Sequence, residues 1–240
     1  TDTGDIETAQ AFYEEAIAIA RDTGDRAAES LRLGNLGWFH MMTGRYREAV
    51  TALESAMEIS RHLKNPLVEA VQRDNLAQVY ARLGKYAIAQ DYHREALRIA
   101  EEIGQRDWLA IFHSNFGETL ARQGQHASAA AQYARALELS RANDDKVTVA
   151  RTLWRLGDLQ RAAGDLEAAA ASYAEAVTIA RPIGAQRDLA CAYLGQGMLA
   201  LAEARTEQAR ELLAEAERLF AILHAPERQQ TQQALSQLAA

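Results

Sequence analysis

A spacing of forty residues runs through this chain and restricts its fold more than any other feature. One column at that spacing holds small residues, at Gly4, Gly44, Gly84, Gly124, Gly164 and Ala204. Five residues after each member stands an alanine, at positions 9, 49, 89, 129, 169 and 209. Seven residues later comes a second alanine column, at 16, 56, 96, 136, 176 and 216. Register kept over a whole chain is the signature of a repeat protein, which grows by stacking similar units.

Each unit contains two helical runs separated by the glycine of the first column. Between residues 65 and 104, Val68, Val71 and Leu76 recur at spacings of three to five residues, as an amphipathic helix requires. The glycine ends the first helix as a left-handed C-cap, and an aspartate such as Asp165 caps the next helix. The links are short and polar, which makes neighbouring helices antiparallel. Helices are predicted at 5–22, 26–42, 45–62, 66–82, 85–102, 106–122, 125–141, 146–162, 165–181, 187–203 and 205–223, with one more after Pro226.

The unit from 145 to 184 carries the most complete pattern of leucine, small and aromatic residues. Its members are Leu153, Leu156, Gly157, Gly164, Ala169, Tyr173 and Ala176. This pattern resembles the tetratricopeptide repeat. The long unit is similar to the repeats of kinesin light chains and to the C-terminal arrays of bacterial regulators of the STAND, LuxR and SARP types. The resemblance implies an all-α fold, a right-handed α-solenoid of antiparallel helix pairs, and a function in binding other proteins.

The repeat also predicts how the chain is divided. We expect an array over 1–225 that opens with a half repeat at 1–24, and a C-terminal capping helix at 226–240. Whole repeats are predicted at 25–64, 65–104, 105–144, 145–184 and 185–225. A solenoid unit buries its faces with both helices, so the half repeat indicates a fragment of a longer protein. The surface around Phe12 and Ile19 is then a candidate for homodimer formation.

Composition narrows the classes of partner. The formal net charge of −7 argues against direct nucleic-acid binding, which needs a basic surface. Cys191 is the lone cysteine, which excludes an internal disulfide and favours a reducing compartment. No apolar run approaches the roughly 20 residues of a membrane-spanning helix. Arginines outnumber lysines by 23 to three, as in GC-rich bacterial genomes. We therefore expect a bacterial, cytoplasmic protein with no membrane partner.

No pattern for catalysis, a cofactor or a metal emerges from the sequence. The six histidines, at 40, 62, 93, 113, 126 and 224, show no paired metal-ligand spacing. His40 falls in the column of Tyr80 and Leu120, which favours a packed histidine over a ligand. The glycines serve as helix caps and helix crossings, so none forms a phosphate-binding loop. The sequence predicts that the chain is not an enzyme and holds no cofactor.

Three asparagines recur where packing does not require polarity, at Asn35, Asn75 and Asn115. The tetratricopeptide resemblance places this position on the concave face of the first helix, beside Gly34, Asp74 and Ser114. A ladder of amides there offers donors and acceptors to an extended peptide. The alternative is that each asparagine ties adjacent helices together.

The same face changes character along the chain. Near its start it carries Trp38, Met41 and Met42, an apolar group that suits an adaptable contact, unless a preceding helix covers it. Further on it becomes rich in arginine, which pairs with carboxylates in two-pronged geometry and favours an acidic peptide. The predicted binding residues are Asn35, Trp38, Asn75, Gln78, Arg82, Asn115, Glu118, Arg122, Arg151, Trp154, Arg155 and Arg161.

Two functions fit these features. The first is a protein-interaction scaffold that binds an extended, acidic peptide or partner segment in its concave groove. The second is a sensor or regulatory domain of a larger bacterial signalling protein or transcription regulator, whose ligand is a small molecule or another domain of the same chain. The second function rests on family analogy alone.

Overall fold

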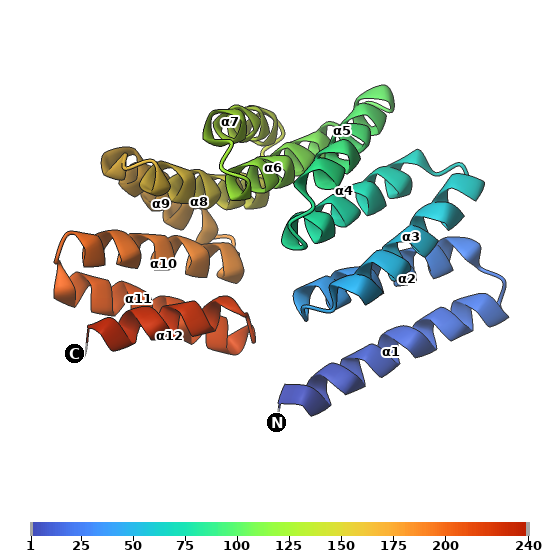
Figure 1. Ribbon diagram of the computed structural model, residues 1–240, viewed down its shortest axis with the longest axis horizontal. Helices are drawn as coiled ribbons and strands as arrows, with labels where there is room; N and C mark the ends of the chain where they lie inside the picture. The colour runs from blue at the N-terminus through green and yellow to red at the C-terminus, as the bar shows by residue number, and fades with distance from the viewer. Residues whose placement is uncertain (1, 239–240) are drawn as a thin grey trace. The chain divides into compact units, whose positions relative to one another are not determined.

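The computed structural model describes the backbone of residues 2–238 and the side chains of residues 6–238, and that part of the chain is all-α (Figure 1). The helices are α1 (Asp2–Asp22), α2 (Arg26–Met42), α3 (Tyr46–His62), α4 (Pro66–Arg82), α5 (Tyr86–Glu102), α6 (Arg106–Arg122), α7 (His126–Ala142), α8 (Lys146–Ala162), α9 (Leu166–Ala180), α10 (Gln186–Ala202), α11 (Thr206–Ile222) and α12 (Glu227–Gln237). The predicted all-α class is confirmed, and the predicted helix ends lie within about three residues of these. One detail is wrong: α1 runs through Gly4, so this glycine does not separate two helices as the column predicted.

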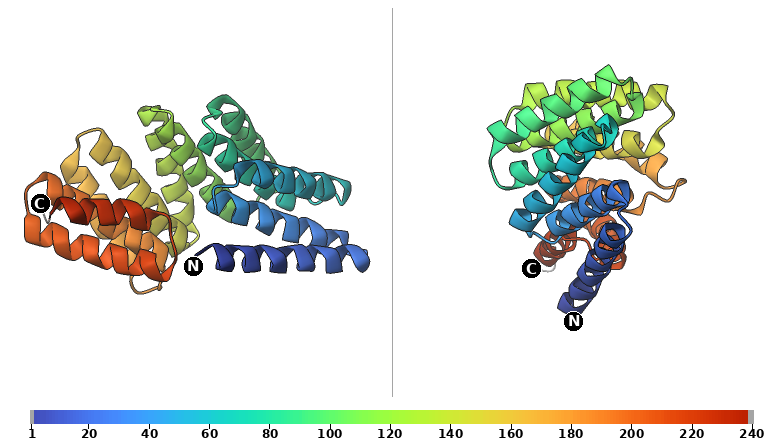
Figure 2. Two further views of the ribbon diagram at one scale, coloured as in Figure 1. Left: turned by 60° about the horizontal axis from the view of Figure 1, so that its bottom comes forward. Right: turned by 90° about the vertical axis from the view of Figure 1, so that its right-hand side faces the viewer.

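The chain divides into two compact units, Thr1–Gln123 and Gly124–Ala240, which we call unit 1 and unit 2. Within each unit every helix packs on the next one along the chain, as Figures 1 and 2 show. The first helices of successive repeats also touch: α2 contacts α4 and α4 contacts α6 in unit 1, and α8 contacts α10 in unit 2. In the described part of the chain, no helix is long and apolar enough to span a membrane.

The helix ends follow from the residue types at the links. Gly44 and Gly164 adopt positive φ angles of 77° and 83°, as the predicted left-handed caps require. Ala204, which replaces glycine in the sixth unit, takes φ of 57° at the same place. The side chain of Asp165 accepts a hydrogen bond from the backbone N–H of Ala168 and so caps α9. The link residues therefore set the length of each helix.

Close crossings between the paired helices explain the small residues of the first helix. A Cβ atom on Gly37 would lie 2.5 Å from Cγ of Leu53, and one on Gly157 would lie 2.7 Å from Cε1 of Tyr173. The small residue thus makes room for the large side chain of the second helix. The alanines at 49, 89, 129, 169 and 209 are fully buried around the same crossings. In these pairs a large residue of the second helix packs against a small residue of the first.

The last helix, α12, packs along α11 (Figure 2). Its buried residues are Thr231 and Ala234, and the rest of the helix is mostly exposed and rich in glutamine. This is the composition expected of a solvated cap on a stack of helices.

Candidate functional site

The predicted binding residues lie on four first helices: α2, α4 and α6 in unit 1, and α8 in unit 2. We call the side of the first helices that carries these predicted binding residues the first-helix face. No residue equivalent to Trp38 is buried in any repeat, at 38, 78, 118, 158 or 198. Asn35, Trp38, Arg82 and Arg122 are exposed, whereas Asn75, Gln78, Glu118, Arg151, Trp154, Arg155 and Arg161 are half-buried. Asn115 is buried, with 7% of its surface exposed.

Four residues that we placed on this face are buried: Gly34, Met41, Asp74 and Ser114. Met41 and Asp74 are each 2% exposed, and Ser114 is 1% exposed. The physical reason is helical geometry, since positions 34 and 41 of a repeat unit are seven residues apart and share one side of the helix. Met41 packs with Leu53 and Val79, so the expected exposed cluster of Trp38, Met41 and Met42 does not form.

Asp74 is the centre of a buried hydrogen-bond network between α4, α5 and α6. Its Oδ1 lies 2.9 Å from Nδ1 of His93, and its Oδ2 accepts hydrogen bonds from Nε2 of Gln78 at 3.0 Å and Nδ2 of Asn115 at 2.7 Å. Nε2 of His93 lies 2.9 Å from Oγ1 of Thr119. An ionised carboxylate can only accept, so both amide groups must turn their nitrogens toward Asp74. The network fixes their orientation.

Asn115 therefore ties α6 to α4, which is the alternative role considered for the asparagine ladder. Asn35 is exposed and Asn75 half-buried, so these two stay predictions for a ligand-facing role. The order Asp74, His93 and Thr119 has the connectivity of a carboxylate–imidazole–hydroxyl relay. His93 is 0% exposed and stacks on Phe116 with ring centroids 5.1 Å apart, so no substrate reaches it. We assign the network to packing.

Sequence reasoning missed His93, although the repeat carried a signal for it. At its position the other second helices have Tyr13, Leu53, Tyr133, Tyr173 and Leu213. A histidine in a column of large packing residues is buried, and a buried imidazole needs polar partners. Asp74, the residue directly before Asn75, supplies the main one.

In unit 2 the corresponding face carries arginines, two of which contact aspartates. Nε1 of Trp154 donates to Oδ1 of Asp188 at 3.0 Å, and Nε of Arg151 lies 3.4 Å from the same oxygen. The guanidinium carbon of Arg155 lies 5.5 Å from the centre of the Trp154 ring, in cation–π contact. Asp188, on α10, thus fixes the indole on which Arg155 rests. The structure brings three of the four predicted α8 residues into one group.

The fourth, Arg161, belongs to a separate group with Asp158 and Tyr173. The Tyr173 hydroxyl donates to Oδ1 of Asp158 at 2.6 Å, and Nε of Arg161 lies 3.4 Å from that hydroxyl. Burial raises the pKa of Tyr173, and the neighbouring charge of Asp158 raises it further. Burial opposes the charge of Arg161, but its contacts with Tyr173 and Asp158 raise the pKa overall. Arg161 therefore stays charged and Tyr173 stays neutral.

The arginines of unit 1 differ from these. Arg122 donates to Glu118 one turn earlier on α6, with Nη2 2.9 Å from Oε1. Its charge is therefore largely balanced on the same helix. Arg82 is exposed near the end of α4. The first-helix face is accordingly rich in amides in unit 1, whereas in unit 2 it carries three arginines, of which Arg151 and Arg161 also contact Asp188 and Asp158.

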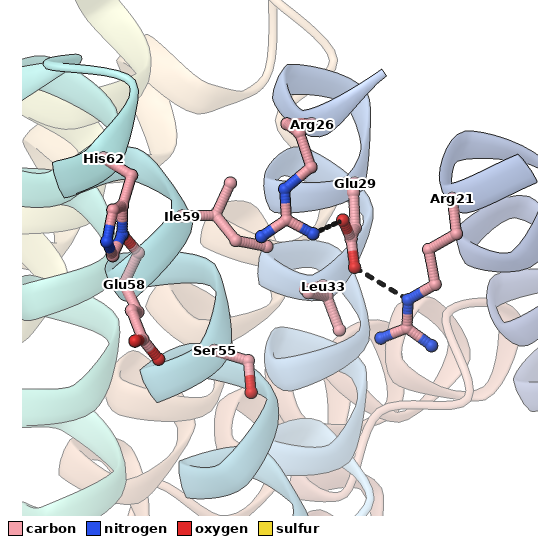
Figure 3. A pocket seen from close by; sticks show the side chains of 8 residues that line it. All are labelled: Arg21, Arg26, Glu29, Leu33, Ser55, Glu58, Ile59 and His62. Atoms are coloured by element: carbon pink, nitrogen blue, oxygen red, sulfur yellow. Dashed lines mark hydrogen bonds and ion pairs between the residues drawn. The ribbon is translucent and has the colours of Figure 1, made fainter. Parts of the chain in front are cut away.

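A second concavity lies outside the predicted site, between α1, α2 and α3 (Figure 3). It has a volume of about 240 Å³, and we call it the Glu29 cavity. Its lining residues are Arg21, Arg26, Glu29, Leu33, Ser55, Glu58, Ile59 and His62. Among the described residues, no group of histidine, cysteine and acidic side chains is arranged to hold a metal ion.

Comparison with known sequences gives the family. The sequence model described as "Tetratricopeptide repeat" matches residues 1–62, 67–142 and 110–182. These matches cover well over half of the chain, and the helix pairs agree with them. The chain belongs to the tetratricopeptide repeat family.

Solved structures with this fold include proteins of several kinds. A Rap protein complexed with competence and sporulation factor is 13% identical, with a TM-score of 0.74, over 99% of this chain and 71% of that one. BtubC (BKLC) from P. vanneervenii is 20% identical, with a TM-score of 0.71, over 91% of this chain and 92% of that one. The signal transduction ATPase with a tetratricopeptide repeat sensor from Pyrococcus horikoshii is 16% identical, with a TM-score of 0.68, over 95% of this chain and 37% of that one. At these identities the likeness concerns the fold.

Proposed function

We propose that this chain is a protein-interaction scaffold whose first-helix face binds an extended, acidic peptide or partner segment. The observation that carries the proposal is the arginine group on α8. Arg151 and Arg155 are half-buried around Trp154, and Asp188 fixes the indole between them. Guanidinium groups held in this way can pair with carboxylates while losing little side-chain freedom.

In unit 1 the residues proposed to bind a peptide are mainly amides rather than arginines. Asn75 and Gln78 are half-buried amides on one face of α4, and Asn35 and Trp38 occupy the equivalent positions on α2. Amides suit the backbone of an extended peptide, because they offer both a donor and an acceptor. The Rap protein of the same fold was solved in complex with a competence and sporulation factor, which supports ligand binding by folds of this kind.

The alternative is a sensor or regulatory domain of a larger bacterial signalling protein, acting in the cytoplasm. The Pyrococcus horikoshii protein favours it, because this chain matches only 37% of that longer chain, which carries a tetratricopeptide repeat sensor. In that setting the ligand is another domain or a small molecule. The two functions are compatible, since a sensor can act by binding a peptide.

An array of acidic, neutral and basic peptides tests the proposal with the purified chain. We expect saturable retention of acidic peptides, weakened at least about tenfold in Arg155→Gln, because a paired guanidinium contact is lost. Asn75→Ala is expected to weaken the same peptides by a smaller factor.

The matched control is Arg135→Gln on α7, which removes an exposed arginine from a second helix and should leave retention unchanged. Circular dichroism checks that each variant keeps its helical content. Retention of basic peptides only, or equal retention by wild type and Arg155→Gln, would contradict the proposal.

A further inference from the structure

The Glu29 cavity contains a buried carboxylate whose partners come from the protein surface. The Glu29 side chain is 4% exposed, with Nε of Arg21 2.7 Å from its Oε1. Nη1 of Arg26 contacts the other oxygen. Both arginine side chains are more than half exposed, at 58% and 57%. Figure 3 shows Arg21 and Arg26 on either side of Glu29, with Glu58 and His62 on the facing helix α3.

The next repeat provides an internal template for this place. A shift of forty residues turns Arg21 into Arg61 and Glu29 into Glu69, and the ion pair is kept, with Nε of Arg61 3.0 Å from Oε1 of Glu69. Glu69 has a second partner, Arg73, with Nη2 at 2.8 Å and Nε at 3.1 Å from the same oxygen. Burial raises the pKa of Glu69, but these arginine hydrogen bonds outweigh it and lower the pKa overall.

The two repeats differ in where the second guanidinium comes from. Arg73 is an inner partner, with only 13% of its side chain exposed. The residue equivalent to Arg73 is Leu33, which lines the Glu29 cavity and has no donor. Glu29 is instead reached from the rim by Arg26, whose equivalent in the next repeat is Pro66. Leu33 therefore offers Glu29 no donor from the inner position, and its side chain borders the cavity instead.

The opposite wall has also changed in charge. Glu58 lines the cavity where the next repeat has Arg98, which pairs with Glu95 and Glu102. The cavity thus has two carboxylates, Glu29 and Glu58, and the apolar side chains of Leu33 and Ile59. Arg21, Arg26 and His62 complete its polar lining with Ser55. A planar cation with an aliphatic stem matches this lining.

We infer that the Glu29 cavity is a binding site for a guanidinium group, which takes the place that Arg73 fills in the next repeat. The ligand donates to Glu29 and Glu58, and its stem packs on Leu33 and Ile59. Arg26 gives up its contact and turns into solvent, and the guanidinium of the ligand replaces it as a partner of the buried carboxylate. The guanidinium comes either from an arginine side chain of a partner protein or from a free guanidinium compound. This site is separate from the first-helix face.

The test is a titration of the ¹⁵N-labelled chain, followed by NMR chemical shifts. The probes are free L-arginine and N-acetyl-L-arginine methylamide, with N-acetyl-L-citrulline methylamide as the neutral match of the second. We expect saturable shifts confined to the start of α2 and the end of α3, and binding at least about tenfold weaker for the citrulline compound. Saturation by the capped compound alone indicates an arginine side chain of a protein, and saturation by free arginine alone indicates a small molecule.

Variants test the template directly. Leu33→Arg should supply the inner guanidinium and abolish probe binding, whereas Arg26→Ala should tighten it by removing a competitor. Glu58→Gln changes an exposed residue of the wall, so it keeps the fold and should weaken binding severalfold even if Leu33→Arg unfolds. Absence of saturable shifts with both arginine probes, equal binding of the citrulline compound, or unchanged binding in Glu58→Gln would overturn the inference.

Discussion

Units 1 and 2 each have a second-helix residue, at the same repeat position, that hydrogen-bonds an aspartate. The two aspartates differ in how deeply they are buried. His93 in unit 1 and Tyr173 in unit 2 are equivalent second-helix residues, and each hydrogen-bonds an aspartate of the paired first helix. Asp74 is 2% exposed, whereas 46% of the Asp158 side chain is exposed. Tyr173 is fully buried, but its hydroxyl reaches an aspartate that is partly exposed, whereas the shorter His93 bonds an aspartate inside the core.

This difference in burial suits the two aspartates to different roles, stability in unit 1 and the proposed binding in unit 2. In unit 1 both oxygens of Asp74 are bonded to partners inside the protein, and they fix the side-chain amides of Gln78 and Asn115. In unit 2 the aspartate shares the surface with Arg161, so its polar groups remain within reach of a ligand. Equivalent second-helix residues thus bond an aspartate inside the core of unit 1 and a partly exposed aspartate in unit 2, where we propose that the neighbouring arginines bind a ligand.

We expect the largest effect from a substitution that breaks the hydrogen-bond network of unit 1. Asp74→Ala removes the acceptor of His93, Gln78 and Asn115, and leaves buried donors without partners. We expect a loss of about 3–5 kcal/mol in the free energy of unfolding. Asp158→Ala in unit 2 should cost about 1 kcal/mol, since water replaces its contacts. Urea unfolding followed by circular dichroism compares the two variants, and equal losses would refute the contrast in depth.

A smaller effect is expected from helix crossings. A Cβ atom on Gly195 would lie 2.2 Å from Cε1 of Tyr173, a buried ring held between α8 and α10, so Gly195→Ala should cost about 1–3 kcal/mol. In unit 1 a Cβ atom on Gly34 would meet the side-chain amide of Gln72 at 2.4 Å. That amide is the end of a flexible side chain and can move, so Gly34→Ala should cost less than about 1 kcal/mol. Thermal unfolding of both variants decides the order, and a costlier Gly34→Ala would show it wrong.

The smallest expected effect concerns pH. Burial lowers the pKa of His40, and the charge of Arg45 lowers it further, while Glu48 and Glu14 oppose them. A histidine with a lowered folded-state pKa stabilises the fold above its unfolded pKa of about 6.5. That contribution is lost as the pH falls from about 6.5 through the folded-state value. His40→Leu, the residue found at Leu120, should flatten the fall in stability between about pH 7 and 5. An unchanged pH profile in the variant would remove His40 as its cause.

Much of the fold could be predicted because the link residues and the repeat spacing are local signals. Gly44 and Asp165 mark helix ends through their own backbone preferences, without help from distant parts of the chain. The exposure of Trp38 and its equivalents likewise follows from helical periodicity.

The site was harder to predict because the burial of a side chain depends on its packing partners, which an alignment of the repeats does not show. Asn35, Asn75 and Asn115 look equivalent in sequence, yet Asn115 alone is tied to Asp74. The Glu29 cavity depends on the absence of an arginine at Leu33, which has meaning only after Arg73 has been seen against Glu69. The proposed binding sites therefore rest on differences between the repeats rather than on the positions that the repeats share.

The most direct test of peptide binding by the first-helix face uses the three tryptophans as reporters. Trp154 and Trp38 lie on the predicted site, whereas Trp108 lies at the start of α6 and packs against Phe112. We would follow their indole N–H signals by NMR while adding the acidic peptide that the array retains most strongly. The account predicts a saturable shift of Trp154, whose indole is bonded to Asp188 beside Arg151, and an unmoved Trp108. Saturation that shifts Trp108 and leaves Trp154 unchanged, or an array that retains no acidic peptide, would contradict it.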